Sequence, residues 1–123
     1  MISKNQTLDK RPMSFIHEVD SIIETNLDNV LFCSDVLSRE LGLSKMQIHR
    51  KIKLATGKST ALYIRFLRLC QSKKLLKQTD WPISEVAYKV GFQDHSYFSR
   101  AFSKEFGIAP RTYRRVCTEN MLL

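Results

Sequence analysis

The chain repeats one pattern, in which two short helices are separated by a glycine turn. Gly42 and Leu43 match Gly91 and Phe92 at an offset of 49 residues. Beyond this turn the second copy has one extra residue, and the offset becomes 50. The positions that match there are Ile48, Arg50, Ile52, Gly57, Tyr63 and Arg65 in the first copy and Phe98, Arg100, Phe102, Gly107, Tyr113 and Arg115 in the second. Such a repeat implies one structural unit built twice, here a helix-turn-helix.

Apolar residues recur at helical spacing along the chain, and no alternating run is long enough to predict a sheet. Longer helices are expected over about residues 13–27 and 59–78, and a short one near residues 111–116. Four further helices are expected to end at Gly42, Gly57, Gly91 and Gly107. Their expected N-terminal caps are Ser34, Ser44, Ser84 and Asp94, and Ser44 forms a capping box with Gln47.

We therefore expect an all-α fold of about seven helices, in which a long linker helix joins two helix-turn-helix lobes. The lobes are expected over residues 13–58 and 80–117, with the linker helix over residues 59–79. Residues 1–12 are expected to form a flexible segment and residues 118–123 a C-terminal tail. A linker helix of about 20 residues would be about 30 Å long.

The second helix of each copy has one face predicted to be buried and one predicted to be exposed. The residues expected to be buried are Ile48, Ile52 and Ala55 in the first copy and Phe98 and Phe102 in the second. The exposed stripes consist of Met46, His49, Arg50 and Lys53 and of Ser96, Ser99, Arg100 and Ser103. Other positions expected to be buried are Ile16, Val19, Ile23 and Leu27, and Leu62, Phe66, Leu69 and Leu76 in the linker helix.

Positive charge is concentrated in the middle of the chain. The formal net charge is +8, with 20 Lys and Arg against 12 Asp and Glu. Residues 12–40 contain six acids and one base, whereas residues 41–79 contain ten bases and no acid. This middle stretch is the expected electrostatic footprint of a polyanion, and nucleic acid is the first candidate. A solvated basic face without a partner is the alternative.

Several other classes of protein find no support. No apolar run reaches the roughly 18–20 residues that span a bilayer, and the polar start lacks the apolar stretch of a signal peptide. Cys33, Cys70 and Cys117 have no C-x-x-C pairing, so we expect reduced thiols and neither a disulfide framework nor a zinc cluster. No phosphate-binding loop or catalytic motif is present. We therefore expect a cytoplasmic protein that is not an enzyme and has no cofactor.

The aromatic and histidine residues are expected to have structural roles, and not to bind metal or stack on bases. A metal pair of His49 and His95 would lack a third ligand at usable spacing, so no metal site is expected. His17 is expected to be a surface or packing residue, and Trp81 a core residue at the junction of the lobes. The aromatic cluster of Phe92, Phe98, Phe102 and Phe106 is expected to form core, because single-stranded nucleic-acid binding would need exposed rings.

The segment ISEVAYKVGFQDHSYFSRAFSKEFGIAPRTYR, residues 83–114, resembles the carboxy-terminal signature of the AraC/XylS family of transcriptional regulators. The motifs I-x-x-V-A, G-F, S-Y-F-S-R-x-F, K-x-F-G and P-x-x-Y-R occur in order and at the family spacing. Residues 37–69 look like the more variable first unit of the same domain, and the resemblance covers about residues 15–116. The motifs HRKIK, YIR and KEFG also resemble the output domain of hybrid two-component sensor-regulators.

The resemblance implies a seven-helix domain that binds double-stranded DNA and reads two adjacent major grooves, which lie about 34 Å apart. The family's base-contacting positions correspond to Met46, His49 and Arg50 in the first copy and to Ser96, Tyr97 and Arg100 in the second. Some relatives have a larger aromatic residue at the position of Met46, so their base preference does not transfer. Residues expected to contact phosphates are Lys45, Lys51, Lys53, Lys58 and Arg111.

The family resemblance also implies transcriptional control, most often activation through RNA polymerase. The chain is expected to be either a complete small regulator or, as we favour, a fragment of a longer one. It is expected to be monomeric in isolation and to have no membrane contact of its own. If the parent is a hybrid sensor, that parent can be membrane-anchored. Two alternatives from other classes are a methyl-accepting DNA-repair protein, for which no cysteine has the expected context, and a basic signalling module, for which no residues remain to form an effector pocket.

Overall fold

The structure is a computed structural model that describes residues 12–29 and 31–122. The described part of the chain contains seven α-helices and no strand, so the predicted all-α fold is confirmed. Most of the N-terminal segment expected to be flexible lies outside the described residues. The helices are α1 (Pro12–Glu24), α2 (Ser34–Leu41), α3 (Lys45–Thr56), α4 (Thr60–Gln78), α5 (Ile83–Lys89), α6 (His95–Phe106) and α7 (Pro110–Leu122).

Two of the four predicted helix caps are confirmed. Ser44 Oγ accepts a hydrogen bond from the Gln47 amide at 3.1 Å, and Gln47 Oε1 accepts one from the Ser44 amide at 2.9 Å, which is the predicted capping box. Asp94 caps α6 by accepting from the Ser96 amide at 2.9 Å. The caps predicted at Ser34 and Ser84 are wrong. The residues at the cap positions of α2 and α5 are Cys33 and Pro82, and both serines lie inside the first turn of their helices.

The last helix is longer than predicted. It was expected near residues 111–116, but α7 continues to Leu122. No Gly or Pro interrupts this stretch, and Arg115 and Glu119 form an i, i+4 ion pair with 3.7 Å between nitrogen and oxygen. Pairs at this spacing support a helix by a few tenths of a kcal/mol, about 0.2–0.5 kcal/mol each. Residues 118–122 are therefore helical.

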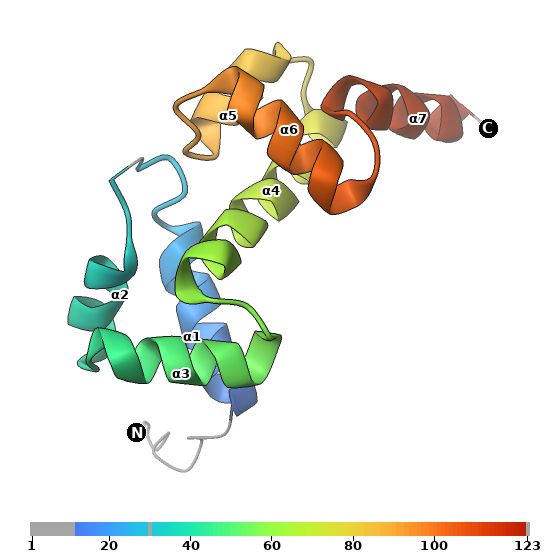
Figure 1. Ribbon diagram of the computed structural model, residues 1–123. Helices are drawn as coiled ribbons and strands as arrows, with labels where there is room; N and C mark the ends of the chain where they lie inside the picture. The colour runs from blue at the N-terminus through green and yellow to red at the C-terminus, as the bar shows by residue number, and fades with distance from the viewer. Residues whose placement is uncertain (1–11, 30, 123) are drawn as a thin grey trace, which may run out of the picture. The chain divides into compact units, whose positions relative to one another are not determined.

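The chain divides into two compact units, each with its own core. Unit 1 contains α1, α2, α3 and the start of α4 as far as Arg65, whereas unit 2 contains the rest of α4, α5, α6 and α7. Residues 27–29, which follow α1, also belong to unit 2. In unit 1, α1 and α2 both pack against α3, and in unit 2, α6 packs against α5 and α7 (Figure 1).

The core of unit 1 differs from prediction at its edges. Val19, Ile23, Ile48 and Ile52 are fully buried as expected. Ile16 is only half-buried, because Phe15 takes the inward position one residue earlier. Ala55, which was expected to be buried, is exposed. The remaining buried apolar residues of this core are Leu37, Phe32, Tyr63 and Ile64.

The linker helix α4 buries different sides in the two units. Leu69 and Leu76 are buried as predicted, but Leu62 is 45% exposed and Phe66 is half-buried. In unit 1 the buried residues of α4 are instead Thr60, Tyr63 and Ile64. The two ends of α4 therefore pack into separate cores, and the single apolar stripe predicted for this helix is wrong in its first half.

Unit 2 is built around a chain of aromatic rings, as predicted. The ring centroid of Phe98 lies 5.2 Å from that of Phe92 and 5.8 Å from that of Phe102. Phe102 in turn contacts Phe106 at 4.8 Å and Tyr113 at 5.8 Å, both edge-on. Phe98 and Phe102 are fully buried. Edge-on pairs at these separations are the favoured geometry for aromatic rings.

The prediction that Trp81 is a core residue is wrong. Its side chain is 38% exposed, and the Lys89 ammonium lies 5.5 Å from the centre of its ring. The break between α4 and α5 is held through the backbone instead, because Arg114 Nη1 donates to the Trp81 carbonyl oxygen at 2.7 Å. The Trp81 ring therefore lies at the surface, and only the backbone of this residue is bound by Arg114.

Candidate nucleic-acid interface

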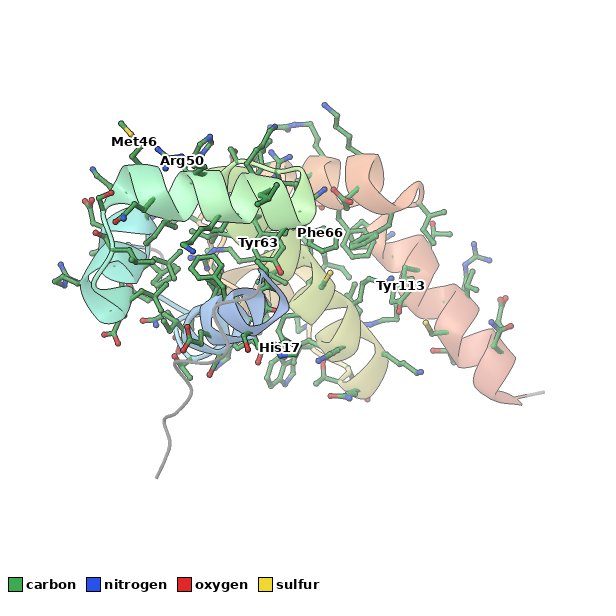
Figure 2. The ribbon with its side chains drawn as sticks, turned by 90° about the horizontal axis from the view of Figure 1, so that it is seen from below. His17, Met46, Arg50, Tyr63, Phe66 and Tyr113 are labelled. Atoms are coloured by element: carbon green, nitrogen blue, oxygen red, sulfur yellow. The ribbon has the colours of Figure 1, made fainter. Side chains whose placement is uncertain are left out.

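The outer face of α3 carries the first predicted stripe. Met46 is 70% exposed, and His49, Arg50 and Lys53 are exposed as well. Figure 2 shows Met46 and Arg50 pointing away from α1, on the side of α3 opposite the core. The predicted exposure of this stripe is confirmed, because it lies opposite the fully buried Ile48 and Ile52.

The guanidinium of Arg50 is available to a partner. Neither Arg50 nor Lys53 forms a hydrogen bond or ion pair with any residue in the part of the chain that the structure describes. A planar guanidinium with five donors suits the two acceptors of a guanine edge. Arg50 and Lys53 lie close together along the helix at i, i+3 spacing, so α3 presents a reading group and a neutralising charge side by side.

The corresponding face of α6 carries the second predicted stripe. Ser96 and Arg100 are exposed, whereas Ser99 and Ser103 are half-buried. Arg100 also has no hydrogen bond or ion pair to any described residue. Tyr97 combines two roles, because it is 40% exposed while its ring centroid lies 5.8 Å from that of Phe92. The Tyr97 ring is therefore partly exposed and partly packed against the core.

The five predicted phosphate-contacting residues differ in their surroundings. Lys53 and Arg111 are exposed, whereas Lys51 and Lys58 are half-buried. The Lys51 ammonium lies 5.5 Å from the centre of the Phe15 ring, on the α1 side of α3. Lys45 forms an ion pair with Asp35 at 3.0 Å. The hydrogen bond to Asp35 and the charge of Asp35 raise the pKa of Lys45.

One base of the predicted electrostatic footprint faces inward. Arg68 is only 7% exposed, and burial lowers the pKa of its guanidinium. Its Nη1 donates to the carbonyl oxygens of Leu27 and Val90, and Nη2 donates to that of Asn29 at 3.2 Å. A charge count cannot distinguish such a residue from a surface cation. Arg68 is therefore structural and does not belong to the binding surface.

Sequence reasoning also missed Asp35 as a partner of the predicted surface. It lies in the first turn of α2, and its carboxylate meets the first residue of α3. No local signal pairs Asp35 with Lys45, because the two residues lie in different helices and ten positions apart. No group of His, Cys, Asp and Glu that could hold a metal ion occurs among the described residues.

Comparison with known proteins identifies the family. Residues 37–116 match the family described as a helix-turn-helix domain. The chain belongs to the AraC/XylS family of transcriptional regulators. The transcriptional activator RhaS of Salmonella newport is 35% identical to it over 83 residues, which is 68% of this chain and 30% of that relative. The chain thus spans about a third of the length of the curated relatives it matches.

Solved AraC/XylS structures agree with the fold. The AraC-type regulator from Chromobacterium violaceum has a TM-score of 0.75 at 29% identity, covering 79% of this chain and 86% of that one. The C-terminal domain of the two-component response regulator yesN from Fusobacterium nucleatum has a TM-score of 0.72 at 32% identity, covering 82% and 98%. The predicted resemblance to the AraC/XylS family is confirmed, and the similar structures include domains of two-component response regulators.

Membership of the AraC/XylS family decides between the classes of function considered above. The family consists of DNA-binding transcription regulators and not of enzymes. The chain is therefore a sequence-specific DNA-binding domain, and neither the methyl-acceptor nor the signalling alternative is favoured. No helix in the described ranges is long and apolar enough to cross a membrane.

Replacing Asp35 with Asn is expected to tighten DNA binding by this AraC/XylS domain. The gain should be only about two- to fivefold, because an exposed ion pair is weak. The change removes a negative charge near α3 and releases Lys45 for a phosphate. Fluorescence anisotropy with a duplex at several salt concentrations measures it, and the salt dependence should steepen. Glu40→Gln, a change at another exposed acid of α2, is the control for charge alone. Equal gains from both variants would contradict a specific role for the pair.

Proposed function

We propose that this domain reads two adjacent major grooves on one face of a DNA duplex, with α3 and α6 as the recognition helices. The repeat supports this proposal, because both helices follow a glycine turn and carry an exposed Arg at the same repeat position, Arg50 and Arg100. The length of α4 also supports it. Its 19 residues make a rod of about 28 Å, close to the separation of about 34 Å between successive major grooves.

Six side chains are proposed to contact bases. Arg50 and Arg100 would each bond a guanine through two atoms, which is worth roughly 1–3 kcal/mol of discrimination. Met46 suits a thymine methyl group, and the Ser96 hydroxyl suits either a donor or an acceptor. His49 and Tyr97 complete the set; both side chains are exposed, and Tyr97 lies beside the stripe of α6 and not on it. The stripe on α6 is thus richer in hydroxyls, which favours contacts through water.

The proposed phosphate contacts fix the position of each unit on the duplex. Lys45, Lys51, Lys53 and Lys58 lie on or directly after α3, and Arg111 lies in the first turn of α7 after α6. These contacts would supply affinity without reading sequence. Lys45 would exchange its Asp35 partner for a phosphate, and Lys51 would need to swing away from Phe15.

The role in the cell follows from the relatives. We propose that the whole protein is a transcriptional activator, as RhaS is named, and that it acts through RNA polymerase in the cytoplasm. We propose that residues 13–58 and 80–117 act as the two DNA-reading lobes, with residues 59–79 as the helix that links them. We propose that the isolated domain is a monomer, because each unit already contains a complete recognition helix with its supporting core.

Arg50→Ala and Lys53→Ala are expected to have different effects. Arg50→Ala should lose sequence selectivity, because it removes a group that reads a base edge. Lys53→Ala should weaken binding to all duplexes and lower the slope of log affinity against log salt by about 0.9 for the lost phosphate contact. Titrations of a selected and a scrambled duplex at several salt concentrations distinguish the two.

Lys74→Ala is the matched control for both changes. Lys74 is an exposed base on α4 and belongs to neither proposed recognition helix. It should leave both the selectivity and the salt slope close to those of the parent chain. The surface assignment is wrong if Arg50→Ala and Lys53→Ala bind the selected duplex as the parent does.

A further inference from the structure

Helix α3 carries a large apolar side chain that none of the contacts proposed above uses. Leu54, in the last turn of α3, is 78% exposed, which is more than Met46 at 70%. A single exposed leucine is common on protein surfaces and by itself indicates nothing. The position of Leu54 on the helix, however, is specific.

Leu54 continues the row of side chains that contains Met46 and Arg50. The three residues follow one another at intervals of four, so their side chains lie nearly one above the other along one face of α3. Figure 2 shows the first two of them pointing away from α1. The fully buried Ile48 and Ile52 lie on the opposite side of the helix. Leu54 is thus the last side chain of the face that is proposed to enter a major groove.

The surroundings of Leu54 are basic. The exposed Lys53 precedes it, Lys58 follows shortly after the end of the helix, and α3 contains no acidic residue. Such a surface suits a polyanion, but a leucine on it contributes no charge. Leu54 can therefore add to binding only by removing apolar surface from water. The apolar group that the major groove of DNA offers is the 5-methyl group of thymine.

The spacing of this row also matches the spacing of base pairs. Four residues of an α-helix rise about 6 Å, whereas successive base pairs are about 3.4 Å apart. Neighbouring members of the row are therefore about two base pairs apart when α3 lies along the groove. If Arg50 bonds a guanine, Met46 and Leu54 reach bases on opposite sides of that guanine.

We propose that Leu54 contacts the 5-methyl group of a thymine in the half-site that α3 reads. This thymine lies about two base pairs from the guanine bonded by Arg50, on the side away from the base that Met46 contacts. The proposal rests on the proposed function, because it requires α3 to lie in a major groove. Leu54 then determines specificity at one end of the half-site, because a cytosine there would offer no methyl group.

Removal of single thymine methyl groups tests the proposal. A duplex is first selected from random sequences with the whole 123-residue chain. Each thymine of the half-site that Arg50→Ala relaxes is then replaced by deoxyuridine, which pairs as thymidine does but lacks the methyl group. At one thymine we expect the parent chain to lose about three- to fourfold in affinity, as for the loss of one buried methyl-sized group.

Leu54→Ala should bind the selected duplex more weakly and should show no further loss at that thymine. The side chain is exposed and Ala is a good helix former, so this variant should fold as the parent does. Met46→Ala should keep the loss at that thymine, because it changes a contact on the other side of the guanine. Leu62→Ala, a change at an exposed leucine of α4, is the matched control and should keep both the affinity and the loss.

The outcomes separate the proposal from the function on which it rests. If a sequence is selected but Leu54→Ala keeps the loss of the parent at every thymine, or no deoxyuridine weakens binding by the parent, the Leu54 proposal alone is overturned. Equal weakening of a selected and a scrambled duplex by Leu54→Ala, with an unchanged response to deoxyuridine, would assign the side chain to the DNA backbone and refute the methyl contact. If the parent selects no sequence, or Arg50→Ala relaxes no half-site, both the proposal and the proposed function are overturned.

Discussion

Gly91→Ala is expected to destabilise unit 2 by roughly 3–5 kcal/mol, from left-handed strain and steric overlap together. Gly91 has a φ of +93° in the turn between α5 and α6. A Cβ there would overlap both the guanidinium of Arg68 and the backbone carbonyl oxygen of Leu27. Arg68 is buried and hydrogen-bonded, so neither neighbour can withdraw without losing contacts. Arg68 thus occupies the space that a side chain at position 91 would fill.

Gly107→Ala is the control within the same unit. Gly107 has a φ of +82° after α6, but a Cβ there would meet no atom within 4 Å. Only the left-handed strain remains, which costs about 1–2 kcal/mol. Urea unfolding followed through Trp81, the one tryptophan of the chain, reports on unit 2. Equal losses in the two variants would show that no steric overlap exists at Gly91.

Arg68→Met is expected to destabilise unit 2 by about 3–5 kcal/mol, because the carbonyl oxygens of Leu27, Asn29 and Val90 lose their buried donor. The side chain of Met fills similar space but donates nothing. Residues 27–29 should then detach from unit 2, which faster amide hydrogen exchange near Asn29 would reveal.

Arg68→Lys tests the geometry of the interaction. One ammonium cannot match the span of a planar guanidinium, so this variant should recover only part of the stability. Lys74→Met, at an exposed position of the same helix, should change stability by less than about 0.5 kcal/mol. If Arg68→Met is as stable as Lys74→Met in urea unfolding, the three hydrogen bonds do not support unit 2.

The fold was largely predictable from sequence because local signals agree with one another. The repeat, the glycines after α2, α3 and α6 and the capping box at Ser44 each mark a boundary independently. The faces of α3 and α6 were predictable because each helix packs against its core on one side only, so a single helical angle decides which residues are buried. Met46 and Ile48 illustrate this, being 70% and 0% exposed.

The errors in prediction arise where tertiary contacts decide whether a side chain is buried and which residue it pairs with. The periodicity of α4 cannot show that the helix serves two cores, so Leu62 was assigned to the interior. Trp81 was assigned to the core by residue type, but Arg114 binds only its carbonyl oxygen, and the ring lies at the surface. Arg68 was assigned to the basic surface and Asp35 was missed, because their partners are distant in sequence or in another helix.

The central claim is that α3 and α6 read separate, successive major grooves. The most direct test selects bound sequences from random duplex DNA with the parent chain, and then repeats the selection with Arg50→Ala and with Arg100→Ala. We expect two half-sites about 10 base pairs apart, with Arg50→Ala relaxing one half-site and Arg100→Ala relaxing the other. A single half-site, or relaxation of the same half-site by both variants, would contradict the account.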